Sequence, residues 1–287
     1  MPNHKTLTLC LVLLVLQQNL AAQYNHDTSR YNVFYGSAKQ LHGNVKVINC
    51  FVSAGKKGWS IEEKNRVLAQ QEHGRQWILR QATKYWQVND LSITTSTFGL
   101  ENDIKLEKIE RDAEPNKLHV NWVPLVLNAI GYNNIPYFCD SINKANQPDN
   151  VVVLIFAKKP GRSYAQPSNS NNVLNQRFLE GAVIYSEGFE GYELSDATIV
   201  HEMLHLFGAW DIYNSYMQKP EVEAKARAVF PTSIMLDTHR DLNPLMIDQL
   251  TAWCIGWIKS YWDWYEYFRP SIDKKDKELM KLVEPNN

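Results

Sequence analysis

The stretch HEMLHLFGAWD, residues 201–211, constrains the fold of this chain more than any other feature. On an α-helix, residues four positions apart lie on the same face, so the imidazoles of His201 and His205 can converge on one metal ion. Glu202 lies roughly a third of a turn away, where its carboxylate can hydrogen-bond a water molecule held by the metal. The stretch therefore predicts a metal-binding helix that carries its own general base.

A catalytic zinc ion has three protein ligands and one open position, so a third ligand is needed. Gly208 can adopt the left-handed conformation that ends a helix, after which the chain can turn back and present Asp211. We expect one zinc ion per chain, bound by His201, His205 and Asp211, with Glu202 as the catalytic base. The alternative is a third ligand from the next helix, either Glu221 or Glu223.

The first 22 residues are typical of a secretory signal peptide. A short apolar run, 7–16, follows a basic start and leads to the small pair Ala21-Ala22, where we expect cleavage. The run is short for a membrane span, although an uncleaved N-terminal anchor is the alternative. The protein is therefore expected to be exported, either secreted or periplasmic.

The rest of the chain is expected to form one domain. Residues 23–44 are polar and predict an arm or a short pro-segment. Residues 45–287 predict a single domain that carries the metal site, with an upper lobe, 45–208, and a lower lobe, 209–287. Three cysteines remain after the leader, and their odd number leaves the pairing open. They are Cys50, Cys139 and Cys254.

The charge balance narrows the class of partner. The formal net charge of the 287 residues is −1, with no block of lysine and arginine, which disfavours nucleic acid and anionic membranes. No apolar run after the leader is long enough to cross a membrane. We expect a monomer that acts on a peptide or protein substrate.

Hydrophobic patterning predicts a mixed α/β fold with a smaller, helical C-terminal lobe. Ser60 and Glu63 form a capping box that begins a long helix ending near Val88, and Ser195 with Asp196 caps the helix that carries the metal ligands. Strands are expected at 45–52, 91–98 and 151–156, with an edge strand at 181–185. Residues 119–130 are expected to form a short helix or a buried turn, and further helices are expected at 221–229 and 244–268.

The string HExxHxxGxxD resembles the zinc-binding motif of the metzincin metallopeptidases, in the snapalysin-like variant where aspartate replaces the third histidine. The triplet Ser233-Ile234-Met235 is similar to the methionine turn of that family, which places Met235 beneath the metal. The resemblance implies a mostly parallel sheet with an antiparallel edge strand. Where several metzincins have a tyrosine two residues after the methionine, this chain has Asp237, so His239 and Tyr213 are the candidates to stabilise the transition state.

The resemblance implies a secreted zinc-dependent endopeptidase in which Glu202 activates a zinc-bound water. An extended substrate would then pair with the edge strand at Gly181, Ala182 and Val183. Two alternatives remain. One is a zinc amidase or cell-wall hydrolase acting on a non-protein substrate, and the other is a non-catalytic, zinc-stabilised binding module that uses the aromatic residues between 257 and 268.

Overall fold

The fold is taken from a computed structural model of the chain. It describes residues 37–38, 40–109, 122–133, 137–138, 141–142, 147–166, 179–188, 191–215, 218–237 and 241–270. The predicted signal peptide, Cys139 and His239 lie outside these ranges.

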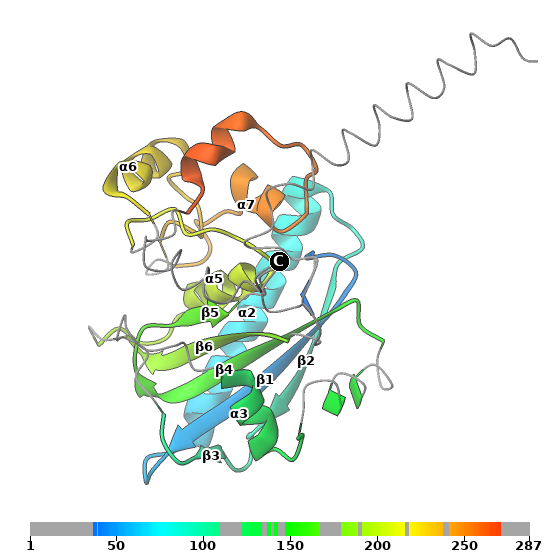
Figure 1. The fold of residues 1–287 in the computed structure, drawn as a ribbon, viewed down its shortest axis with the longest axis vertical. Helices are drawn as coiled ribbons and strands as arrows, with labels where there is room; N and C mark the ends of the chain where they lie inside the picture. Colours follow the sequence, from blue (N-terminus) through cyan, green and yellow to red (C-terminus); the bar gives the residue numbers. More distant parts are fainter. Residues whose placement is uncertain are drawn as a thin grey trace, which may run out of the picture.

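The centre of the molecule is a six-stranded, mostly parallel sheet with the path β2-β1-β4-β6-β5, in which β3 extends the pairing of β1 (Figure 1). Every pair is parallel except β5 with β6. The strands are β1 (Asn44–Ala54), β2 (Ser92–Phe98), β3 (Ile104–Leu106), β4 (Asn150–Pro160), β5 (Tyr164–Gln166) and β6 (Glu180–Glu187). The predicted mixed α/β class with a mostly parallel sheet is confirmed.

The prediction that residues 181–185 form the edge strand is wrong. They lie within β6, which pairs with β4 on one side and with β5 on the other. Gly181, Ala182 and Val183 are opposite the three residues of β5, so their backbone groups are already used within the sheet. The antiparallel strand at this end of the described sheet is β5, which is too short for hydrophobic patterning to reveal.

Helices cover both faces of the sheet. On one face lie α2 (Ile61–Trp86) and α5 (Asp196–Leu206), and on the other lies α3 (Trp122–Ala129) (Figure 1). Side chains of a strand alternate between the faces. In β4, Val152 and Leu154 therefore pack with α2 and α5, while Val153 and Ile155 pack with α3. Because both faces are covered, these strands are continuously apolar.

The first long helix begins as predicted. The Ser60 side chain accepts a hydrogen bond from the Glu63 backbone N–H, and the Glu63 side chain accepts one from the Ser60 backbone N–H, which completes the capping box. Halfway along α2, Gly74 contacts α5. A Cβ at Gly74 would lie 2.7 Å from the Val200 side chain, so the absence of a side chain lets the two helices approach closely.

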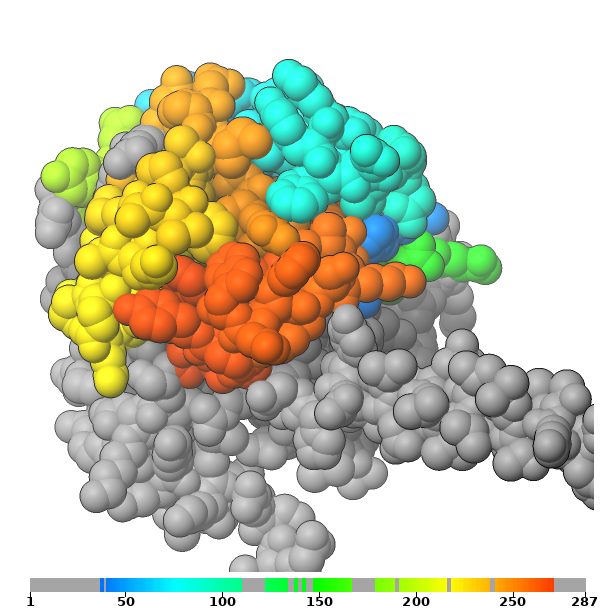
Figure 2. Space-filling view, turned by 90° about the horizontal axis from the view of Figure 1, so that it is seen from above, coloured from blue at the N-terminus to red at the C-terminus, as the bar shows by residue number. Residues whose placement is uncertain are grey.

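Residues 218–237 and 241–270, the described C-terminal part, contain three short helical segments. They are α6 (Pro220–Val229), α7 (Gln249–Cys254) and the 3₁₀ helix η2 (Asp263–Phe268). The prediction of one helix over 244–268 is wrong, because the chain turns at Gly256, whose φ of 85° is outside the helical region. Figure 2 shows α6 and residues 241–268 forming a continuous surface beside α2.

One core joins this C-terminal part to the sheet. Apolar residues of the sheet, α2 and α5 pack in a single cluster with α6, α7 and η2. The N-terminal segment belongs to the same cluster, since the Leu41 N–H donates to the Ile255 carbonyl at 3.0 Å and the Trp257 indole donates to the Leu41 carbonyl at 2.8 Å. Fully buried Ala38 and Leu41 thus pack in the same core as the strands.

Two other expectations from the sequence concern membrane spans and cysteine pairing. Among the described residues, no helix has the length and apolar content needed to span a membrane. Cys50 and Cys254 are free thiols, so they do not pair with each other.

Candidate metal centre

The motif begins in helix α5, which packs on the same face of the sheet as α2. Its N-cap is Ser195, as predicted, and the Ser195 side chain accepts a hydrogen bond from the Thr198 N–H at 3.1 Å. The helix ends before Gly208, whose φ of 96° reverses the chain direction. The Ala209 N–H then donates back to the Leu204 carbonyl at 3.2 Å. This reversal returns Asp211 to the face of α5 that bears the histidines.

The structure brings His201, His205 and Asp211 together. The two imidazole Nε2 atoms are 3.0 Å apart, and Asp211 Oδ1 lies 3.2 Å from His201 Nε2 and 3.1 Å from His205 Nε2. The three atoms therefore form a nearly equilateral triangle. All three side chains are largely buried, with 3%, 15% and 19% of the side-chain surface exposed.

Backbone carbonyl groups orient both imidazoles. His201 Nδ1 lies 3.0 Å from the Ile234 carbonyl oxygen, and His205 Nδ1 lies 2.7 Å from the Ala209 carbonyl oxygen. A carbonyl only accepts, so Nδ1 of each ring carries a proton, and in the neutral imidazole the lone pair of Nε2 is directed into the triangle. Metal-binding histidines are held in this way in other proteins.

This geometry fits a zinc ion. For bond lengths of about 2.0–2.1 Å, the edges of a tetrahedral ligand set are roughly 3.3 Å, close to the three separations found here. Asp211 Oδ1 is also buried without a properly aligned hydrogen bond, despite its closeness to both rings. Three lone pairs that face one another in a buried place are stabilised by a positive charge between them, either a proton or a metal ion.

The charges of the cluster act on one another. Burial lowers the pKa of His205, but the Asp211 carboxylate outweighs it and raises this pKa to about 9. Burial raises the pKa of Asp211, but the neighbouring His205 and His201 hold it well below its usual range. The cluster therefore binds a positive charge strongly, and a metal ion would take the place of the proton.

Glu202 is set up for proton transfer. Its residue is 6% exposed, and no hydrogen bond to its carboxylate is found within the described ranges. Burial raises its pKa, and the nearby His201 and His205 only partly offset that effect. A carboxylate with a raised pKa and with no hydrogen-bond partner among the described residues has the properties of a general base.

The triplet 233–235 supports the cluster through its backbone. The Ile234 carbonyl orients His201, and the Met235 carbonyl accepts from the N–H of Ile212, which follows Asp211. Met235 itself is fully buried. The turn thus contacts the chain beside the metal ligands, while the role of Met235 beneath a metal stays a prediction.

The residue that supports this turn, Asp248, was missed by sequence reasoning. Asp248 is the N-cap of α7, and its carboxylate accepts from the Ser233 hydroxyl at 2.6 Å and the Thr251 hydroxyl at 2.6 Å. Ser233 Oγ in turn accepts from the Met235 N–H at 3.0 Å. An aspartate before a helix is the available sequence signal, but it indicates only a cap.

Replacing Asp248 with alanine should destabilise the protein by about 2–4 kcal/mol, because a helix cap is lost and two buried hydroxyls lose their acceptor. Urea unfolding followed by circular dichroism measures the change. The control is Asp263→Ala, which removes an exposed aspartate from the start of η2 and should change the unfolding free energy by less than about 0.5 kcal/mol. Equal effects of the two substitutions would contradict the supporting role of Asp248.

Tyr213 lies against the cluster of His201, His205 and Asp211. Its ring centroid is 6.1 Å from that of His201, and its hydroxyl accepts a hydrogen bond from Arg162 Nη2 at 3.2 Å. Burial, with the Asp211 charge, raises the pKa of the phenol, so the hydroxyl remains protonated at neutral pH. Of the two candidates to stabilise a transition state, Tyr213 is therefore near the cluster and His239 lies outside the described residues.

Sequence reasoning also missed Arg162, because an isolated arginine far from the motif carries no pattern. Burial lowers the pKa of Arg162, but the effects of Tyr213, Asp211 and Glu202 are together larger, so that the pKa is raised. The guanidinium therefore lies within the electrostatic field of the cluster.

The alternative third ligands lie elsewhere. The Glu223 carboxylate accepts from the Asn214 N–H at 2.6 Å and pairs with Arg227 at 2.7 Å, and Glu221 is exposed. Among the described residues, the group of possible ligands close enough to share one metal ion consists of His201, His205 and Asp211.

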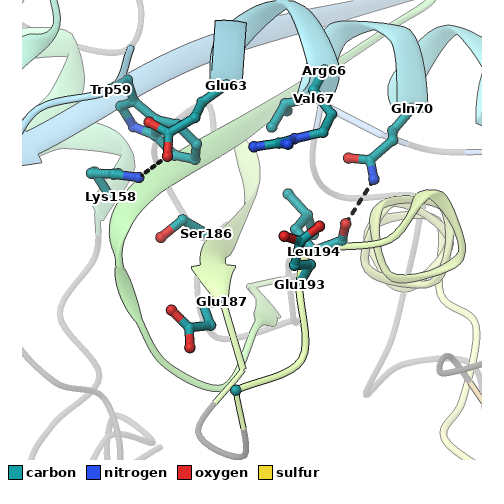
Figure 3. A pocket seen from close by; sticks show the side chains of 11 residues that line it. Trp59, Glu63, Arg66, Val67, Gln70, Lys158, Ser186, Glu187, Glu193 and Leu194 are labelled. Atoms are coloured by element: carbon teal, nitrogen blue, oxygen red, sulfur yellow. Dashed lines mark hydrogen bonds and ion pairs between the residues drawn. The ribbon is translucent and has the colours of Figure 1, made fainter.

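A cavity of about 270 Å³ lies away from the cluster, between the start of α2 and the end of β6 (Figure 3). Its lining includes Trp59, Arg66 and Glu193, together with the ion pair of Lys158 and Glu63. None of the three clustered ligands lines it, so the cavity and the candidate metal centre are separate sites.

No protein-family model matches the chain, and no curated protein matches it.

Proposed function

We propose that this protein is an exported, zinc-dependent endopeptidase of the metzincin type. The observation that carries the proposal is the triangle of two Nε2 atoms and one carboxylate oxygen, 3.0–3.2 Å apart, next to a buried glutamate. A structural zinc site needs four protein ligands, whereas a three-ligand site leaves a position for substrate. His201, His205 and Asp211 would hold the ion.

When bound, zinc supplies a Lewis acid that polarises a carbonyl group and lowers the pKa of water. The chain's own residues do the rest. Glu202 takes the proton of the attacking water and later delivers it to the leaving amine, and its raised pKa suits both roles. Tyr213 donates its hydroxyl hydrogen toward the charge that develops on the carbonyl oxygen, since Arg162 donates to its oxygen.

The arrangement of the sheet supports the proposed family. The sheet is parallel except for β5 at the end of the strand path, and helix α5, which carries His201 and His205, packs against β5 and β6. This arrangement agrees with the architecture that the resemblance implies. The spacing of Gly208 and Asp211, and the turn at Ser233, agree with it at the level of residues.

Two other functions use the same residues. A zinc amidase acting on a non-protein substrate shares the whole chemistry, and only the substrate separates it from a peptidase. A binding module has no use for a buried Glu202 that lacks a hydrogen-bond partner among the described residues. Its proposed aromatic platform is also partly core, since Trp257, Tyr265 and Phe268 are buried, although Trp262, Trp264 and Tyr267 are exposed.

The purified chain without its leader should cleave a denatured protein at internal bonds, and a chelator should abolish cleavage because the ligand triangle then binds no metal. Mass spectrometry of the fragments reads the cleavage sites, and added zinc should restore them. Metal analysis should give about one zinc per chain. Cleavage that survives a chelator, or a chain that binds zinc and hydrolyses no peptide, would contradict the proposal.

A further inference from the structure

Arg162 is held in a fixed position between β4 and β5. On one side, Gly161 packs against the ring of Tyr185, where a Cβ would lie 2.5 Å from ring atoms, and the Gly161 N–H donates to the Glu187 carbonyl at 2.9 Å. On the other side, Ser163 Oγ accepts from the Tyr185 N–H at 3.2 Å. Both neighbours of Arg162 are therefore bonded to β6, which fixes the backbone position of Arg162 at this end of the sheet.

The guanidinium of Arg162 retains most of its hydrogen-bonding capacity. One N–H group donates to the Tyr213 hydroxyl, and no carboxylate pairs with the guanidinium within the described ranges. A guanidinium has five N–H donors in a planar fork that matches a carboxylate. The residue as a whole is exposed, so a ligand can reach this side chain from solvent.

This cation lies beside the candidate metal centre. Its hydrogen-bond partner Tyr213 contacts His201 through the ring, and the charges of Asp211 and Glu202 act on the guanidinium. Asp211 Oδ1 faces the two imidazoles, and no ion pair between Asp211 and Arg162 is found among the described residues. Among the described residues, no anion occupies the remaining donors of Arg162, so they are available to an anion of a bound substrate.

We propose that Arg162 selects substrates that carry a carboxylate close to the bond to be cleaved. The inference rests on the proposed peptidase function and adds a substrate class to it. An acidic side chain and a free C-terminal carboxylate offer the same chemistry, a planar anion that accepts two parallel N–H groups. Hydrogen bonds to a charged group predict a preference of about ten- to a hundredfold over an uncharged analogue.

A binding experiment tests the proposal without turnover. The full chain with Glu202→Gln, loaded with zinc, is dialysed against pools of acetylated hexapeptides that differ in one fixed residue, Asp or Asn, and in a free or amidated C-terminus. The Asp pool with an amide end reports side-chain recognition, and the Asn pool with a free end reports terminal recognition. We expect at least one of them to bind about ten- to a hundredfold more tightly than the Asn amide pool.

Adding Arg162→Gln should remove this difference, and Arg162→Lys should restore part of it, because lysine keeps the charge and loses the fork. The matched control is Arg66→Gln, which removes an exposed arginine beside the separate cavity and should leave the difference unchanged. Equal binding of all pools, including no binding, overturns the proposal. Digestion of the same pools by the chain with Glu202 intact tests the peptidase function separately, so that either hypothesis can fail alone.

Discussion

Replacing Glu202 with glutamine should lower peptide hydrolysis by about a thousandfold, the size of a general acid–base contribution. Glutamine has the same shape but cannot take a proton from water or return one to the leaving amine. The zinc content should remain at about one per chain, because Glu202 is not part of the ligand triangle. Initial rates on a peptide substrate, with metal analysis of the same sample, measure both quantities.

The control for this substitution is Glu193→Gln, which removes a carboxylate from the separate cavity. Its rate should stay within about twofold of the unmodified chain. A Glu202→Gln protein that cleaves at the original rate would exclude a general base at this position. A protein that loses its zinc together with its activity would show that Glu202 contributes to metal binding instead.

Replacing Asp211 with alanine should weaken zinc binding by about a hundredfold or more. Structural sites with four ligands bind zinc with a free energy of about 10–16 kcal/mol, which corresponds to roughly 3 kcal/mol for each ligand. The loss also leaves the Nε2 atoms of His201 and His205 facing each other without the carboxylate. Titration of the metal-free protein against a zinc-binding dye measures the affinity.

Asp211→His is the companion variant, since histidine is an alternative zinc ligand, and it should recover part of the lost affinity. Asp241→Ala removes an exposed aspartate that accepts from Asn243 in a surface turn, and it should bind zinc normally. An unchanged zinc affinity in Asp211→Ala would exclude this carboxylate as a ligand and redirect the search to another residue.

Local patterns predicted the elements that position the candidate site. The capping box at Ser60, the cap at Ser195 and the turn at Gly208 depend on neighbours in the sequence, so a single sequence contains their causes. The grouping of His201, His205 and Asp211 followed from helical spacing and one reversal of the chain. The continuously apolar β4 was likewise recognisable as a doubly covered strand.

Features that depend on distant partners were missed or predicted wrongly. Whether β6 is an edge depends on β5, a three-residue strand with no pattern of its own. The apolar residues of 244–268 do reach the core, but they reach it from two separate segments on either side of Gly256 and not from one helix. Arg162 and Asp248 act on the site from far along the chain, and only tertiary structure brings them there.

The contact between Asp248 and Ser233 has a consequence for the order of events during biosynthesis. The histidine pair is synthesised well before α7, but the carbonyl that aligns His201 belongs to a turn that α7 supports. A nascent or truncated chain that ends before residue 248 would therefore contain every proposed zinc ligand and still lack the aligned pair. We expect an aligned ligand pair only after the last elements have folded, and for the proposed peptidase this order would protect the cell that makes it from premature proteolysis.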